Sequence, residues 1–355
     1  MVKFGIFILL TIAVAIFGLY ALFPGALKPS PEGGRKRWAY LFGIVLLLEA
    51  LAVPFAAAMG WWLPKSASTF SFGIDLLFYI ILAVTGITFI GVGAIFTYVL
   101  FKYPADPGRR SWYTHGSHKL EMVWTAVPAV LLFVLAIAQI PAWLEVKNMG
   151  WLREALQAGE VKPENRFLQV EVTARQWEWR MRYPSAKHID EWNQDGKLLL
   201  KDVRLKLPPR PDDVRVTNEI HCMKGRKVLV HLKTMDVIHS FFLPQMRLKQ
   251  DALPGKTIPV WFEPTEANCY LDGNEWKDGM RLERTVTGTD GKEKEVWVAD
   301  DHYIWELACA EYCGARHSLM RGKLFVHNTE EDFLAWLKKA EADNQQTSIP
   351  EPGKK

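Results

Sequence analysis

One short stretch, CAEYCGARHSLM, brings together four side chains that favour soft metal ions. Two cysteines open it, Cys309 and Cys313, and His317 and Met320 follow them. A further histidine, His239, lies far upstream in DVIHSFFLPQM. Two thiolates, two imidazoles and a thioether are ligands of redox-active copper, whereas hard cations prefer oxygen and structural zinc usually takes no thioether.

The spacing of these residues indicates which kind of copper site they form. Cys-x3-His-x2-Met with a remote histidine is typical of a mononuclear blue-copper loop. The additional cysteine one turn earlier lets two thiolates bridge two copper ions, with one histidine for each ion. Met320 and the backbone carbonyl of Glu311 are then weak axial ligands. A dinuclear centre spreads one electron over two metals, which suits fast electron transfer better than bond making.

Three stretches together resemble subunit II of the haem–copper cytochrome c oxidases. They are CAEYCGARHSLM, DVIHSFFLPQMRLKQDALPG and the aromatic run RQWEWRMRYP at 175–184. The resemblance covers roughly residues 70 to 340. It implies a cupredoxin fold and a dicopper centre of the CuA type. The ligands it implies are His239, Cys309, Glu311 through its carbonyl, Cys313, His317 and Met320.

The same resemblance implies roles for four further groups. Trp177 holds the position through which the electron enters, although it also shares a core-like face with Trp179 and Tyr183. Asp236 matches an acid near the partner's docking site, or is an ordinary exposed loop acid. The Glu311 carboxylate is expected to help hold magnesium at the boundary with subunit I. Glu121 matches a proton-channel entrance, or is an ordinary interfacial acid.

The function implied is that of an electron-entry subunit. It takes one electron at a time from cytochrome c and passes it to haem in subunit I, where oxygen is reduced and protons are pumped. No Cys-x2-Cys-His occurs in the sequence, so we expect no haem on this chain. Two alternatives stay open: the CuA subunit of a nitric-oxide reductase, and a membrane-anchored copper-binding or zinc-stabilised module without a catalytic partner. A quinol oxidase subunit is disfavoured because the copper ligands are all present.

Four apolar segments are each long enough to cross a membrane, at about 4–23, 38–62, 72–101 and 121–143. The loops 24–37 and 102–120 are rich in Lys and Arg. Because positive loops stay inside, we expect the C-terminal part on the periplasmic or outer side of a bacterial-type plasma membrane. The first segment lacks a clear cleavage site, which favours a retained helix over a signal peptide.

Charge separates the chain into two unlike halves. Residues 1–144 carry ten Lys and Arg against five Asp and Glu, whereas 145–355 carry 33 against 34. The basic character thus belongs to the membrane half and is no argument for nucleic-acid binding. Within the apolar segments, Glu49 is costly, and it either lines a proton path, pairs with a neighbouring subunit or lies at a helix-packing or near-interface position.

The second half alternates short β-branched and aromatic segments with Gly/Pro turns, which predicts an antiparallel Greek-key β-sandwich. We therefore expect a membrane α-helical anchor of about four helices followed by an all-β cupredoxin-like domain. The expected parts are an extra two-helix segment 1–63, a transmembrane hairpin 64–145, a copper domain 146–345 closed by a helix at 330–346, and a tail 346–355.

Two features of the predicted copper domain lie outside the copper-ligand motif. A hydrophilic insertion runs over about 264–301, and residues 263–306 hold 12 acids against five bases. It is either a solvated hairpin or a surface that steers a basic cytochrome c. Cys222 and Cys269 lie outside the motif, and either pair in an oxidising compartment or stay as separate small residues.

Overall fold

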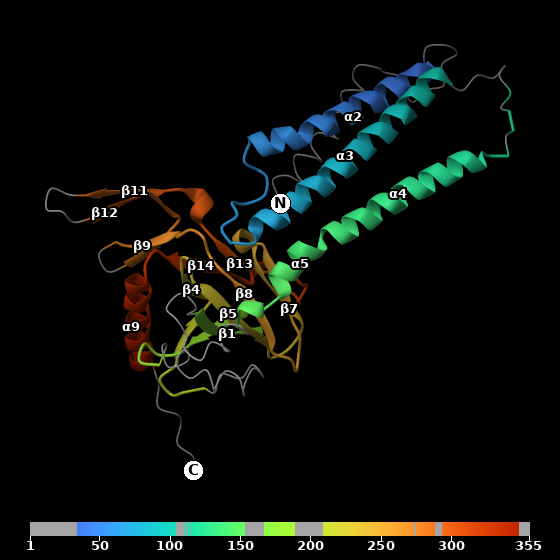
Figure 1. Cartoon of the computed structure of the whole chain (residues 1–355). Helices are drawn as coiled ribbons and strands as arrows, with labels where there is room; N and C mark the ends of the chain where they lie inside the picture. The colour runs from blue at the N-terminus through green and yellow to red at the C-terminus, as the bar shows by residue number, and fades with distance from the viewer. Residues whose placement is uncertain are drawn as a thin grey trace. The chain divides into compact units, whose positions relative to one another are not determined.

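The computed structural model describes residues 34–103, 110, 112–113, 115–152, 167–188, 209–272, 275–287 and 293–347. These residues form two compact units (Figure 1). One unit, Met1–Leu63 with Asp75–Ala138, contains the long apolar helices. The other, Pro64–Ile74 with Gln139–Lys355, contains the β-strands.

Three helices of the described residues are long and apolar enough to cross a membrane. They are α2 (Gly34–Ala58), α3 (Ser71–Lys102) and α4 (His118–Ala138), followed by the short α5 (Ile140–Lys147). They confirm the last three predicted spans within a few residues at each end, and the first, 4–23, lies outside the described residues. Glu121 lies in the first turn of α4, exposed, with its carboxylate 3.7 Å from His118 Nδ1.

Glycines bring α2 and α3 into close contact. A Cβ on Gly93 would lie 2.7 Å from the Leu46 side chain, and one on Gly43 would lie 3.2 Å from Thr97. Small residues allow such approach between helices in a membrane, where packing replaces the hydrophobic effect as the driving force. Part of the extra N-terminal segment thus packs on α3 of its own chain. Glu49 is half-buried in α2 and makes no ion pair with any described residue.

The β-rich unit is built from two five-stranded sheets (Figure 1). The first has the order β3-β2-β1-β5-β8, with strands β3 (Val214–Thr217), β2 (Glu178–Tyr183), β1 (Phe167–Arg175), β5 (Lys227–Thr234) and β8 (Ile258–Phe262). The second has the order β4-β14-β13-β6-β7, with strands β4 (Glu219–Met223), β14 (Arg321–His327), β13 (Glu306–Cys309), β6 (His239–Leu243) and β7 (Leu248–Ala252). This confirms the predicted sandwich.

The pairing within the sheets is not entirely antiparallel as predicted. β1 pairs with β5 in parallel, and β14 pairs with β4 in parallel, one such pair in each sheet. The physical reason is the connectivity. β4 and β5 follow one another in the chain but belong to opposite sheets, so each pairs with a strand distant in sequence. Periodicity along one strand carries no information on which distant strand becomes its neighbour.

Aromatic side chains fill the space between the sheets. Trp179, Tyr183, Phe241 and Trp305 are fully buried. Tyr183 Oη accepts from the backbone N–H of His221 at 2.7 Å and donates to its carbonyl at 3.1 Å, which joins the two sheets. Removal of one such ring typically costs about 3–5 kcal/mol.

The C-terminal helix α9 (Glu330–Thr347) closes one side of the sandwich, as predicted for 330–346. Trp336 stacks on the buried His221 ring with centroids 3.9 Å apart. His221 also contacts His327, with Nδ1 and Nε2 3.1 Å apart, and burial lowers the pKa of both rings well below the ordinary value. The pair is therefore a neutral part of the core beneath α9. Cys222 and Cys269 are buried free thiols nearby, not a disulfide.

The hydrophilic insertion forms two hairpins, β9 (Cys269–Asp272) with β10 (Glu275–Asp278), and β11 (Met280–Thr287) with β12 (Glu293–Ala299). At the base of the second hairpin, the N–H of Asp300 donates to the Gly279 carbonyl at 2.8 Å. The insertion is also tied to the linker that follows the second apolar helix. Lys65 contacts both Glu266 and Tyr303, and Glu266 contacts Tyr303.

Candidate metal centre

Two adjacent strand ends and one loop bring the predicted copper ligands together. β13 ends at Cys309 and pairs antiparallel with β6, which begins at His239. The loop then returns to β14 through a short 3-10 turn, η4 (His317–Leu319). Its two ends are held by the Cys309 N–H, which donates to the Met320 carbonyl at 3.1 Å, and by the Ala310 N–H, which donates to the Ser240 carbonyl at 3.0 Å.

The sulfur and nitrogen atoms of these residues form one continuous cluster. Cys309 Sγ lies 3.9 Å from Cys313 Sγ and 3.8 Å from His239 Nδ1. Cys313 Sγ in turn lies 3.5 Å from His317 Nδ1 and 3.9 Å from Met320 Sδ. The two sulfurs are far beyond the ~2.05 Å of a disulfide. His239 and both cysteines offer ligand atoms within 4.8 Å of one another, the separation expected for ligands of a common metal site.

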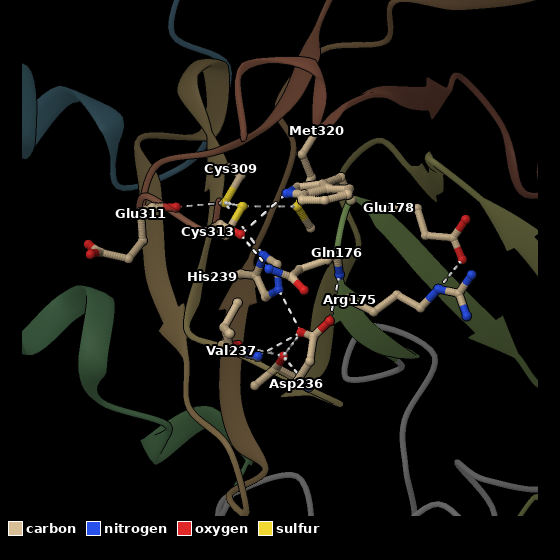
Figure 2. Close-up of polar contacts among 12 residues, drawn as sticks. Arg175, Gln176, Glu178, Asp236, Val237, His239, Cys309, Glu311, Cys313 and Met320 are labelled. Atoms are coloured by element: carbon tan, nitrogen blue, oxygen red, sulfur yellow. Dashed lines mark hydrogen bonds and ion pairs between the residues drawn. The ribbon is translucent and has the colours of Figure 1, made fainter. Parts of the chain in front are cut away.

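Glu311 enters the cluster through its backbone and not through its side chain. Its carbonyl oxygen accepts from Cys309 Sγ at 3.2 Å. Its carboxylate is exposed and points away from the sulfurs (Figure 2). The backbone of this residue thus faces the metal ligands, while the carboxylate is available to a different group.

The two thiols have unlike proton affinities. Burial raises the pKa of Cys309, but hydrogen bonds with His239 and the backbone outweigh it and lower that pKa to about 6. Burial and the neighbouring Cys309 charge raise the pKa of Cys313 to about 12. Thiolates, imidazoles and a thioether together favour a soft cation, so the donor set fits copper.

Asp236 lies behind His239 and connects it to the aromatic turn before β2 (Figure 2). Its Oδ1 accepts from His239 Nε2 at 2.9 Å, and its Oδ2 accepts from the Gln176 backbone N–H at 2.7 Å. Burial raises the pKa of Asp236, but these bonds outweigh it and lower that pKa. Because the carboxylate accepts at Nε2, it leaves Nδ1 of His239 facing the sulfurs.

Trp177 touches the ligand-bearing loop, residues 309–320, directly. Its indole Nε1 donates to the Cys313 carbonyl at 3.3 Å, and Gln176 Nε2 donates to the same oxygen at 2.8 Å. Gly314 makes this approach possible, since its φ is +115° and a Cβ there would lie 3.3 Å from Trp177 Cζ2. Trp179, two residues further along the chain, belongs to the core: it is fully buried and lies edge-on to His239.

Gln176 and Gly314 were not predicted from the sequence as site residues. Gln176 contacts both Asp236 and the Cys313 carbonyl, and only its place beside Trp177 could have pointed to it. Gly314 follows Cys313 within the motif, but the spacing of ligands says nothing about the backbone between them. Glu121 belongs to the other unit and is not part of this cluster.

The fold and the cluster define a membrane-anchored β-sandwich protein with a group of sulfur and histidine ligands able to hold a metal ion. Two family descriptions match the chain in succession: "Cytochrome C oxidase subunit II, transmembrane domain" over residues 56–141 and "Cytochrome C oxidase subunit II, periplasmic domain" over residues 168–274. The chain belongs to the cytochrome c oxidase subunit II family.

Relatives resemble the chain over most of its length. An alternative cytochrome c oxidase subunit 2 of Bradyrhizobium diazoefficiens is 27% identical, covering 83% of this chain and 89% of the relative. A cytochrome c oxidase subunit 2 of Thermostichus vulcanus is 26% identical, covering 88% of each. A crystal structure of the periplasmic domain of subunit II of a Bradyrhizobium japonicum cytochrome oxidase is 19% identical, covers 50% of this chain and 94% of that domain, and has a TM-score of 0.31.

Proposed function

We propose that this chain is the electron-entry subunit of a proton-translocating terminal oxidase. It would accept electrons from cytochrome c at a dinuclear copper centre and pass them to haem in subunit I. The observation that supports this most is the cluster of two cysteine sulfurs, two imidazole nitrogens, a thioether and the Glu311 carbonyl at one end of the sandwich. Membership of the cytochrome c oxidase subunit II family supports the association of this chain with other oxidase subunits.

The proposed ligands are His239 and His317 as terminal groups, Cys309 and Cys313 as bridges, and Met320 and the Glu311 carbonyl as weak axial groups. When bound, the two copper ions would supply a one-electron acceptor and donor whose surroundings change little on reduction. Backbone hydrogen bonds tie the loop to Ser240 of β6 and join Cys309 to Met320, which holds the ligands in place. Asp236 orients His239 by accepting a hydrogen bond from its Nε2.

Trp177 is the proposed point of electron entry. Its ring is partly exposed, and its indole contacts the backbone of Cys313. An electron would thus have a short path from the protein surface to Cys313, through the Trp177 side chain and one hydrogen bond. Asp236, adjacent to the same turn, is partly exposed and adds negative charge that a basic donor protein would meet.

Two further roles concern the boundary with subunit I. The Glu311 carboxylate, which points away from the sulfurs, is proposed to help hold a magnesium ion there. Glu121, exposed in the first turn of α4, is proposed to lie at the entrance of a proton channel. The β-rich unit would then lie on the periplasmic side of a bacterial-type plasma membrane.

The proposal is tested on the intact complex, purified through a tag on this chain. Oxygen uptake with reduced cytochrome c as donor is the expected activity, together with co-purification of a haem-bearing subunit. Consumption of nitric oxide in place of oxygen would contradict the oxidase assignment. Isolation of the chain without any haem-bearing partner would contradict its role as a subunit.

A further inference from the structure

A polar pocket of about 480 Å³ lies on the first sheet, on the face that points away from the core. Side chains alternate across a strand, so the core residues Val170 and Val172 of β1 leave Glu171 and Thr173 on the opposite face. The pocket is lined by Glu171, Thr173, Arg180, Met181, Arg182, Arg215, Val216, Thr217, Lys233 and Met235. Four of these are cations and one is an acid.

Strand register places these side chains in two neighbouring rows. In one row, Arg180 faces Thr217 on one side and Thr173 on the other, and Thr173 faces Lys233. Every member of this row can donate a hydrogen bond, and none is acidic. In the other row, Arg182 lies between Arg215 and Glu171.

The nearby acids are already engaged by part of this positive charge. Glu171 accepts from Arg182 Nη2 at 2.9 Å and pairs with Lys233 Nζ at 2.9 Å, and Asp213 contacts the other Arg182 nitrogen. Arg180 Nε donates to Glu178 at 2.6 Å. These contacts hold Arg182, whose side chain is only 9% exposed, as a fixed cation in the pocket floor.

Three donors of the pocket have no such partner. Among the described residues, the Arg215 guanidinium makes no ion pair or hydrogen bond, and the hydroxyls of Thr173 and Thr217 make no hydrogen bond. Arg215 also lies directly opposite Arg182, and like charges in that arrangement are destabilising. A bound anion would relieve the repulsion and satisfy all three donors.

We propose that this pocket binds a multiply charged oxyanion of the phosphate class. Arginine presents a planar fork that matches phosphate oxygens, and lysine adds a point charge. Arg215 and Thr217 of β3 and Arg180 of β2 would contact the anion from one side and Lys233 of β5 from the other, with the Thr173 hydroxyl between them. The volume has room for a diphosphate or a small phosphorylated molecule.

The test is calorimetric titration of the full-length chain in detergent with inorganic pyrophosphate, at constant ionic strength. One saturable site is expected, and Arg215→Gln should weaken its affinity by at least about 10-fold, because a charge-assisted hydrogen bond is lost. Thr217→Val keeps every charge and should weaken it about two- to fivefold. Lys249→Gln, an exposed lysine on β7 of the other sheet, is the matched control and should bind as the unmodified chain does.

Absence of saturable binding would overturn the proposal. So would equal affinity in Arg215→Gln and Lys249→Gln, because binding would then follow general surface charge. Thermal unfolding of each variant checks that the fold is retained. If Arg215→Gln is destabilised, Thr217→Val decides alone, and unchanged affinity in that variant counts against the pocket.

Discussion

Cys309 and Cys313 make different contacts although only three residues separate them. Cys309 lies against His239 and the Glu311 carbonyl, whereas Cys313 lies against His317 and Met320. Each sulfur thus adjoins one imidazole and one weak ligand. This arrangement supports the proposed pair of copper ions held by both sulfurs.

The first prediction separates a bridging ligand from an axial one. Cys313→Ser should abolish the dicopper centre, because a hydroxyl cannot replace a soft bridging thiolate. Met320→Leu, of similar volume, should keep two coppers per chain and change the reduction potential, since a weak axial thioether tunes potential more than it holds metal. Copper analysis and redox titration of both variants check this. Full copper and unchanged spectra in Cys313→Ser would show that the assigned ligands are wrong.

The second prediction concerns Asp236, which orients His239 and also carries charge beside Trp177. Asp236→Ala removes the acceptor of His239 Nε2 and of the Gln176 N–H, so copper affinity should fall about 10- to 100-fold. Asp236→Asn keeps a side-chain oxygen and should retain copper while raising KM for cytochrome c. Metal titration and steady-state kinetics separate the two roles. If both variants bind copper normally, Asp236 does not position His239.

At the residue scale, the sequence predicted ligand types but not what surrounds them. The positions from Cys309 to Met320 follow from the spacing of soft ligands, because one loop supplies most of them. Gln176 and Gly314 could not be found that way. Their importance depends on the turn before β2 reaching the loop more than a hundred residues later.

At the scale of elements, charged side chains on the outward side of the first sheet join its strands. Glu171 on β1 contacts Arg182 on β2 and Lys233 on β5, which ties three neighbouring strands together. Burial raises the pKa of Glu171, but these two cations outweigh it and lower that pKa below its ordinary value of 4.5.

The third prediction follows from the sign of that shift. The folded state holds the Glu171 proton less tightly than the unfolded state. Its contribution to stability is therefore complete above the ordinary value of 4.5 and is lost as the pH falls through the lower folded pKa. Glu171→Gln should lower the unfolding temperature at pH 7 and flatten its decline as the pH falls below the ordinary value of 4.5. Thermal unfolding of the full chain over this range measures it, with the exposed Glu331→Gln as control. If the unfolding temperatures of Glu171→Gln and Glu331→Gln depend on pH in the same way, Glu171 does not stabilise the fold through these ion pairs.

Helices and strands with a strong periodic pattern could be predicted from the sequence, but which strands pair with one another could not. The membrane helices and α9 follow from continuous or amphipathic apolar patterns. The parallel pairs β1–β5 and β14–β4 depend on chain crossings between sheets, which leave no local pattern. Cys222 and Cys269 show the same limit, because whether two cysteines meet depends on these crossings.

At the scale of the whole molecule, the acidic insertion divides into two parts of different charge. The second hairpin, residues 280–299, carries four acidic and four basic residues. The excess of acidic residues in the insertion therefore lies in the segments that flank this hairpin. Several of those acids are paired, such as Asp278 with Lys323 and Glu266 with Lys65. Glu275 and Asp301 make no ion pair with a described residue and are the free charges there.

The fourth prediction uses this division. Replacing residues 280–299 by a short turn between Gly279 and Asp300, which a backbone hydrogen bond already joins, should leave cytochrome c oxidation unchanged. Glu275→Gln with Asp301→Asn should slow it at low ionic strength only, because salt screens steering over about 8 Å at physiological strength. Kinetics of both variants across a salt series test this. Unchanged kinetics in the double variant would mean that the insertion does not steer the donor.

The most direct test of the central claim is the electron paramagnetic resonance spectrum of the purified, copper-loaded chain. If Cys309 and Cys313 bridge two copper ions, the one-electron-oxidised pair shares a single unpaired electron equally, and the spectrum shows a seven-line hyperfine pattern at two coppers per chain. A four-line pattern at one copper per chain, or no signal with bound zinc, would contradict the dinuclear electron-entry centre.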